Sequence, residues 1–153
     1  MDPSIPGILD KINKMKYREW YRPIAPVVLL EDADEYFEGV GPSRFMSFNP
    51  SVRPKWEDRL SGIVHVDGTA RIQTVSKDQN PWLHELLTAW KEASGYSVLI
   101  NTSLNTRGAP IANTVEEVFD CFLTTELDNI LIEDYIFYKE PKKKMKDKEL
   151  MPY

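Results

Sequence analysis

The apolar positions of the chain come in short runs whose spacing predicts helices and strands in alternation. In the first third, the pattern predicts a helix over 8–14, a buried strand over 25–30 and a short acidic helix over 31–37. The next stretch, 39–59, contains three prolines and is predicted to be irregular. Connections of that length in a compact domain are usually functional or mobile, so this stretch is a candidate for either role.

A hairpin is predicted in the middle of the chain. Asp-Gly at 67–68 is a strong signal for a tight turn, and it separates two apolar segments, 62–66 and 70–75. We therefore expect these segments to be paired strands. Because side chains alternate along a strand, Arg71 and Gln73 should project together from one face.

The clearest helix follows the hairpin. Asn80 is a good N-cap, Pro81 suits the first helical position, and Gly95 is a typical C-terminal stop. The apolar residues between them repeat at helical spacing: Leu83, Leu86, Leu87, Trp90 and Ala93.

The last third predicts a strand over 97–101, a helix and a final strand over 130–138. Thr114 and Glu117 form a capping box at the start of that helix. Four apolar residues are predicted to form its buried face: Val118, Phe119, Phe122 and Leu123. Since strands and helices are interspersed, the predicted fold class is α/β, with an α+β-like character.

Composition and charge indicate one soluble domain over 1–138 and a basic, disordered tail over 139–153. The tail holds six lysines and three acidic residues, whereas the remainder has a net charge of −8. An acidic body argues against a general nucleic-acid binder, and no apolar run is long enough to span a membrane. The single cysteine, Cys121, fits the cytoplasm and is interpreted as a core or boundary residue.

The segment "KYREWYRPIAP", residues 16–26, gathers Lys16, Arg18 and Arg22 within seven residues of an otherwise acidic chain. Its prolines favour an extended backbone. Arginine gives bidentate contacts to phosphate and lysine a point charge, so these cations suit a phosphate group. The alternative is an exposed basic segment paired with surface acids.

The segment "HVDGTARIQTV", residues 65–75, places His65 and Asp67 on one face of its first strand and Arg71 on the second strand. A lone histidine is more often a hydrogen-bonding core residue than a ligand. No second histidine stands at metal-ligand spacing, because His84 is interpreted as a surface residue on a helix. We therefore expect no metal site in this chain.

The segment "SVLINTSLNTRGAP", residues 97–110, runs from a strand directly into hydrogen-bonding side chains. Asn101, Ser103 and Asn105 can direct several polar groups at one point, and Gly108 allows close backbone approach to a ligand. Loops at strand ends are common ligand-binding places in open α/β sheets. The alternative is an Asx-type turn. No phosphate-binding glycine motif is present, so any nucleotide binds by another route.

Together these segments resemble the C-terminal domain of the NodU/CmcH-type O-carbamoyltransferase family. The resemblance rests on "DPSIPGILDKINKMKYREWYRPIAP", "HVDGTARIQTV", "NTSLNTRGAPIA" and "TTELDNILIEDYIFYK", which follow one another in the family's order over residues 2 to 139. It implies a YrdC-like domain, in which a twisted mixed sheet is flanked by helices. It also implies an enzyme that converts ATP, with Mg²⁺, and carbamoyl phosphate into carbamoyl-adenylate.

The resemblance also assigns residues. Lys16, Arg22 and Arg71 would bind the phosphates of ATP and carbamoyl phosphate, while Asn101 and Ser103 would hold the carbamoyl group or a phosphate. Arg71, Asn101 and Ser103 are thus the candidate catalytic residues. Four further members of the matching motifs are candidate binding residues without an assigned role: Arg18, His65, Asp67 and Asn105.

The family also has an arginine-rich stretch and a transferase domain before the "DP" motif, whereas this sequence begins at Met1-Asp2-Pro3. We therefore expect another domain or chain to supply them, and a homodimer to cover any apolar face left exposed. Trp20, Tyr21 and Trp56 are either interface residues or ordinary packing residues.

Two other functions stay open. One is a YrdC-type factor that makes threonylcarbamoyl-adenylate for tRNA modification, since "TSLNTRGAP" is also similar to a stretch of those proteins. The other is a truncated binding module without catalysis.

Overall fold

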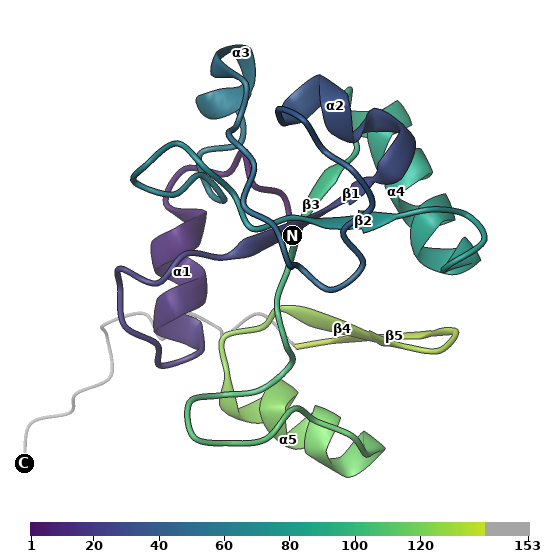
Figure 1. The fold of residues 1–153 in the computed structure, drawn as a ribbon. Coiled ribbons are helices and arrows are strands. Elements are labelled where there is room, and N and C mark those ends of the chain that lie inside the picture. Colours follow the sequence, from purple (N-terminus) through teal and green to yellow (C-terminus); the bar gives the residue numbers. More distant parts are fainter. Residues whose placement is uncertain (140–153) are drawn as a thin grey trace, which may run out of the picture. The chain divides into compact units, whose positions relative to one another are not determined.

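The computed structural model describes residues 1–139 and divides the chain into two compact units, Met1–Ile111 and a second unit that begins at Ala112. The first unit is built around a three-stranded sheet, and the second contains a two-stranded hairpin (Figure 1). The structure is thus a mixed α/β fold, as the element order predicts. Among the described residues, no helix is long and apolar enough to cross a membrane.

Strand β1 (Ala25–Leu29) lies at the centre of the sheet and is buried along its whole length. β2 (Gln73–Val75) runs parallel to it on one side, with Val27 opposite Gln73. β3 (Val98–Asn101) runs antiparallel on the other side, with Ala25 opposite Asn101. The predicted strands over 25–30 and 97–101 are confirmed.

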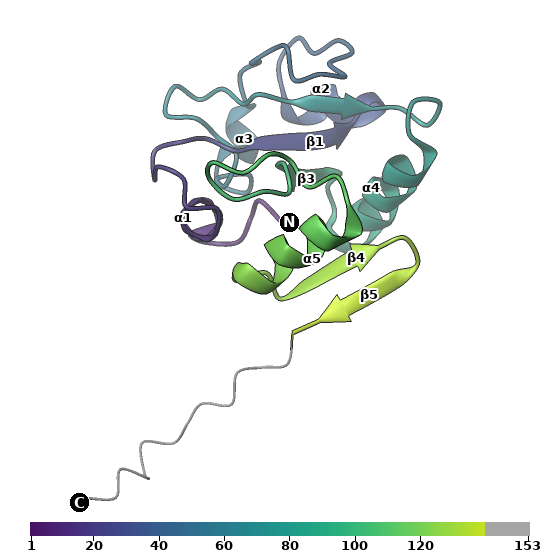
Figure 2. The same ribbon diagram turned by 90° about the horizontal axis from the view of Figure 1, so that it is seen from below.

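Apolar clusters cover both faces of this sheet, and Figures 1 and 2 show α1 and α4 towards opposite ends of its strands. α1 (Ile8–Met15) and α2 (Ala33–Tyr36) contribute to one apolar core together with Val28 and Val98. α4 (Pro81–Ser94) packs on the other face through a smaller apolar cluster. The members of that cluster are Val27, Leu29, Val75, Leu83, Leu87 and Leu99.

The predicted signals for α4 are confirmed at both ends. The Asn80 side chain accepts a hydrogen bond from the Leu83 amide at 3.0 Å, and Gly95 ends the helix with a φ of 86°. Leu86 belongs to the same apolar pattern but is 42% exposed, whereas Leu87 is fully buried on the sheet.

The predicted hairpin around 67–68 is wrong. The turn itself forms, with the Gly68 amide donating to the His65 carbonyl at 2.9 Å, but 62–66 is not a strand. Thr69 and Ile72 form their bridges with Ser51 and Phe48 instead. The irregular stretch 39–59 therefore supplies the partners that the hairpin strand was predicted to supply.

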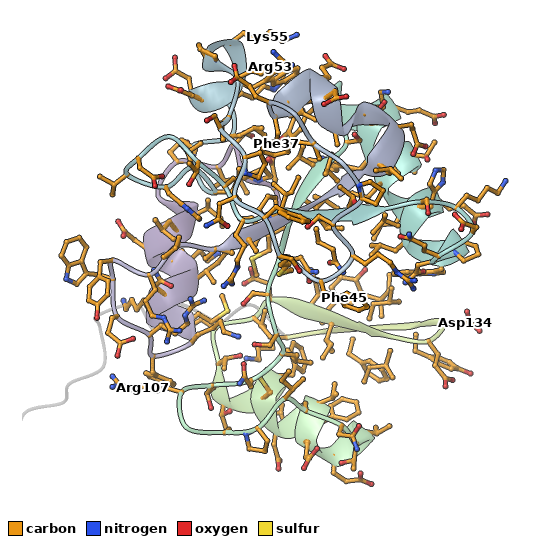
Figure 3. The ribbon with its side chains drawn as sticks, viewed as in Figure 1. Phe37, Phe45, Arg53, Lys55, Arg107 and Asp134 are labelled. Atoms are coloured by element: carbon orange, nitrogen blue, oxygen red, sulfur yellow. The ribbon has the colours of Figure 1, made fainter. Side chains whose placement is uncertain are left out.

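This stretch is partly anchored and partly exposed. Phe37, just before it, is fully buried, whereas Phe45 is 83% exposed; both are labelled in Figure 3. A short 3-10 helix (Leu30–Asp32) precedes α2, so the predicted acidic helix over 31–37 forms as two short pieces. A four-residue helix, α3 (Pro54–Glu57), ends the stretch. The Trp56 ring on it packs 4.9 Å from the Tyr36 ring, so Trp56 is a packing residue.

The second unit contains α5 (Val115–Thr124), β4 (Asn129–Ile132) and β5 (Tyr135–Tyr138). The capping box at Thr114 is confirmed. The single strand predicted over 130–138 is wrong, because Glu133 adopts a φ of 51° and turns the chain into a hairpin. Leu123 is 67% exposed, so it does not belong to the buried face of α5. Apart from Lys139, the predicted basic tail lies outside the described residues.

Gly62 allows a close approach that gives the first testable prediction. A Cβ atom at this position would lie 2.7 Å from the Pro3 carbonyl oxygen and against the Ile8 side chain. Gly62→Ala should therefore lower the free energy of unfolding by about 1–3 kcal/mol, measured by chemical denaturation. Gly41→Ala is the matched control, since its Cβ would meet nothing within 4 Å. Equal unfolding midpoints for the two variants would contradict this packing.

Candidate functional site

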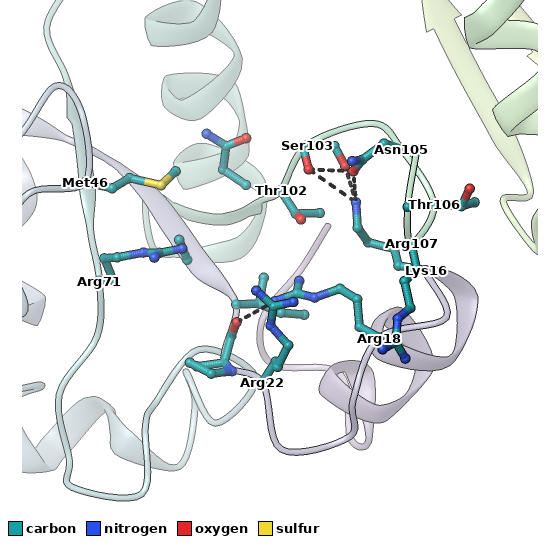
Figure 4. A pocket seen from close by; sticks show the side chains of 15 residues that line it. Lys16, Arg18, Arg22, Met46, Arg71, Thr102, Ser103, Asn105, Thr106 and Arg107 are labelled. Atoms are coloured by element: carbon teal, nitrogen blue, oxygen red, sulfur yellow. Dashed lines mark hydrogen bonds between the residues drawn. The ribbon is translucent and has the colours of Figure 1, made fainter. Parts of the chain in front are cut away.

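A cleft of about 520 Å³ opens at one end of the three-stranded sheet (Figure 4). Three segments that are distant in sequence line it: 16–25, 101–108 and the residue Arg71 that precedes β2, together with Met46. The predicted site residues that line it are Lys16, Arg18, Arg22, Arg71, Asn101, Ser103 and Asn105. The structure thus brings together members of all three polar segments.

Strand direction explains why these segments meet. The basic segment enters β1, so it lies at the beginning of that strand. β3 is antiparallel to β1, so its end, with Asn101, lies beside Ala25. β2 is parallel to β1, so Arg71, two residues before β2 begins, lies towards the same end of the sheet. On the face of the sheet that carries Val27 and Val75, the apolar cluster under α4 covers the strands. The cleft lies beyond that cluster, where Ala25 and Asn101 line it.

Lys16 organises the loop that follows β3. The residue is 8% exposed, and its ammonium group donates hydrogen bonds to the Ser103 carbonyl and, at 3.0 Å, to Asn105 Oδ1. The Ser103 hydroxyl donates to the same Asn105 oxygen at 2.7 Å. Asn105 Nδ2 in turn donates to the Ala109 carbonyl at 3.0 Å. The side chains of Lys16, Ser103 and Asn105 therefore hold one another and define one wall of the cleft.

Three arginines add to the positive charge that Lys16 brings to the cleft. Figure 4 shows Arg18 and Arg22, which belong to one segment, and Arg71, which belongs to another, reaching into it. Burial lowers the pKa of Arg18, and the positive charges of Arg22 and Arg71 lower it further. Arg22 is 3.6 Å from a carboxylate oxygen of Glu19, whereas none of the ion pairs within residues 1–139 includes Arg71. The cluster carries more positive charge than its neighbours neutralise, which favours an anionic ligand.

Arg107 and Met46 also line the cleft, although sequence reasoning did not select them. Arg107 pairs with Glu19 at 3.1 Å, and its amide donates to the Lys16 carbonyl at 3.0 Å. Its positive charge within the polar segment 97–110 could have identified Arg107 as a candidate site residue. Nothing in the sequence marked Met46, which stands in the irregular stretch with a φ of 57°.

His65 and Asp67 do not line this cleft. The Asp67 carboxylate accepts hydrogen bonds from the amide and the hydroxyl of Thr69, at 3.0 and 2.7 Å, and stabilises the turn. His65 lies 3.0 Å from the same hydroxyl and borders a different hollow beside Tyr21. Burial lowers the pKa of His65, and the positive charge of Arg71 adds to this while Asp67 opposes it. His84 is half-buried and contacts Glu31 at 2.6 Å, instead of lying free on the surface.

The role of Lys16 in the wall of the cleft gives a testable prediction. Lys16→Met keeps the aliphatic stem but removes the ammonium that joins Ser103 and Asn105. Hydrogen bonds from a charged group contribute about 1.5–3 kcal/mol, so amide hydrogen exchange over 102–109 should accelerate roughly tenfold or more. Lys14→Met, on the exposed side of α1, is the control. Unchanged exchange in this loop would show that Lys16 does not hold it.

Comparison with known proteins identifies relatives along almost the whole chain. A family model described as the carbamoyltransferase C-terminus matches residues 1–139. The chain is 41% identical over 144 residues to nodulation protein NolO of Bradyrhizobium diazoefficiens, which covers 92% of this chain and 26% of that protein. It is 42% identical over 143 residues to nodulation protein NolNO of Sinorhizobium fredii, covering 90% of this chain and 21% of that protein.

A third relative is nodulation protein U of Rhizobium tropici, 38% identical over 103 residues, which cover 67% of this chain and 18% of that protein. The chain therefore spans about a quarter or less of the length of these curated relatives.

Proposed function

The chain belongs to the carbamoyltransferase family as its C-terminal domain, and we propose that its cleft binds ATP and carbamoyl phosphate and forms carbamoyl-adenylate. The observation that carries the proposal is the convergence of Arg18, Arg22 and Arg71 with Asn101 and Ser103 in one cleft. The mixed sheet with helices on both faces is compatible with the YrdC-like architecture that we propose for this domain.

The residues of the cleft fit two phosphate-bearing ligands. Arginine side chains bind phosphate oxygens bidentately, and here they approach from two segments, 18–22 and 71. Short amide and hydroxyl groups of Asn101 and Ser103 can orient a small, neutral carbamoyl group. Mg²⁺ enters this proposal as the ion that accompanies the phosphates of ATP.

The proposed reaction has two steps. Carbamoyl phosphate and water first give carbamate and inorganic phosphate. An oxygen of the carbamate then forms a bond to the α-phosphorus of ATP, the bond from that phosphorus to the bridging oxygen breaks, and pyrophosphate leaves. Catalysis of such a step depends mainly on positioning and on neutralising charge. That dependence suits a site of fixed cations and short polar side chains.

We propose that a separate domain or chain moves the carbamoyl group to a hydroxyl acceptor, since the relatives are about four times as long as this chain. Trp20 and Tyr21 are 78% and 66% exposed beside the basic segment, so they are candidates for contact with that part or with a second copy of this chain. The proposed cellular location is the cytoplasm, where ATP and carbamoyl phosphate are both available.

The direct test is exchange of labelled pyrophosphate into ATP by this chain, with Mg²⁺ and with or without carbamoyl phosphate. Exchange that depends on carbamoyl phosphate is expected, because adenylation is reversible while carbamoyl-adenylate stays bound. If a folded chain binds neither ATP nor carbamoyl phosphate by calorimetry and supports no exchange, the proposed function is wrong.

Arg71 gives a sharper prediction, because it reaches into the cleft and takes part in none of the ion pairs among the described residues. Arg71→Gln removes one charged hydrogen-bond donor and should weaken ATP binding roughly 10- to 100-fold, as measured by calorimetry. Lys77→Gln removes the same charge from an exposed position just beyond the other end of β2. If both variants weaken binding equally, the effect comes from net charge and not from a contact in the cleft.

A further inference from the structure

A chain of hydrogen bonds fixes the orientation of one amide side chain in the cleft. Asn101 Nδ2 donates to Gln73 Oε1 at 2.5 Å, and Gln73 Nε2 donates to the backbone carbonyl of Arg44 at 3.0 Å. Each amide has a donor end and an acceptor end. Which end of each amide donates therefore depends on the group that ends this series of hydrogen bonds.

That group is a backbone carbonyl, which can only accept. The segment that carries it is firmly placed on the edge of β2: the Ser43 amide donates to Thr74 Oγ1 at 2.7 Å, and the Thr74 amide donates to the Ser43 carbonyl at 3.0 Å. Ser43 is 2% exposed. The Arg44 carbonyl therefore requires the donor end of Gln73, and Gln73 offers its acceptor end to Asn101.

The two amides meet across the central strand. Asn101 lies opposite Ala25 on one side of β1, and Gln73 lies opposite Val27 on the other side. Residues at these registers share a face of the sheet, so both amides lie on that face. The pair thus joins β2 to β3 at the point where the cleft begins.

The consequence concerns the remaining atom of Asn101, its Oδ1. Asn101 lines the cleft, and within the described part of the chain its Oδ1 accepts no hydrogen bond. The cleft therefore presents a fixed acceptor beside several cations. A phosphate oxygen or a carboxylate oxygen suits the cations but not this acceptor, which requires a ligand group that carries hydrogen.

We propose that Gln73 is a positioning residue that holds Asn101 Oδ1 as the acceptor for the NH₂ group of a carbamoyl ligand. This inference rests on the proposed function and names what selects its substrate. The phosphate half of the ligand is held by the arginines, and the amide half is recognised by Asn101. Acyl phosphates without an NH₂ group can satisfy the first requirement but not the second.

Acetyl phosphate is the matched probe, because it has a methyl group where carbamoyl phosphate has NH₂. Calorimetric binding of the two ligands to the full chain isolates the contribution of that group. One neutral hydrogen bond contributes about 1 kcal/mol, so carbamoyl phosphate should bind roughly five- to tenfold more tightly than acetyl phosphate.

Two variants of Gln73 separate positioning from general structural damage. Gln73→Met fills similar space without an acceptor, so Asn101 can turn its NH₂ group into the cleft, and the preference should fall to about twofold or less. Affinity for acetyl phosphate should stay within about twofold of the original. Gln73→Glu keeps an acceptor for Asn101 Nδ2, so the preference should persist while the new negative charge weakens binding of both ligands.

The outcomes distinguish the two proposals. If neither ligand binds to the unaltered chain, the proposed function fails. If both bind equally well, the phosphate site stands and the role of Asn101 is refuted. If Gln73→Met retains the full preference, or weakens both ligands alike, Gln73 does not position Asn101. Arg71→Gln is the reference for a contact on the phosphate side, since it should weaken both ligands by the same factor.

Discussion

The pairing of β1 with two strands of opposite direction is the constraint on which the cleft depends. Because β1 is central and fully buried, its beginning is a fixed point beside which the end of β3 and the start of β2 must both lie. The segments 16–25 and 101–108 and the residue Arg71 are 30 or more residues apart in sequence. They become neighbours only through this arrangement, so a change of register in either pair would separate them.

Within that frame, Lys16 contributes to the shape of the cleft as well as to its charge. A buried ammonium group is costly unless it is well hydrogen-bonded, and here the Ser103 carbonyl and Asn105 Oδ1 accept from it. The loop gains a fixed conformation from a residue of another element. Arg18, Arg22 and Arg71 do not hold the loop in this way. The Arg18 guanidinium donates to the Pro23 carbonyl at 3.2 Å, and Arg22 lies 3.6 Å from a Glu19 carboxylate oxygen.

The sequence predicted elements whose signals are local. The caps of α4 and the continuous apolar run of β1 identify those elements without reference to the rest of the chain. The hairpin at 67–68 was mispredicted because Thr69 and Ile72 pair with residues of the irregular stretch. No local sequence pattern indicates that pairing. The same limit applies to the site. The resemblance to the family placed Arg71 and Asn101 in one site. Only the folded structure shows that His65 lies outside the cleft and that Gln73 contacts Asn101.

In the proposed function, affinity and selectivity have separate physical origins in this cleft. Arginine side chains attract phosphate through charge, and that attraction does not distinguish one acyl phosphate from another. Discrimination requires a group with a fixed direction, and a freely rotating amide has none because it can offer either end. The backbone carbonyl of Arg44 removes that freedom from Gln73, and Gln73 removes it from Asn101. In the proposed function, a carbonyl at the edge of the sheet therefore determines which end of the Asn101 amide faces the ligand, and with it which acyl group the site would accept.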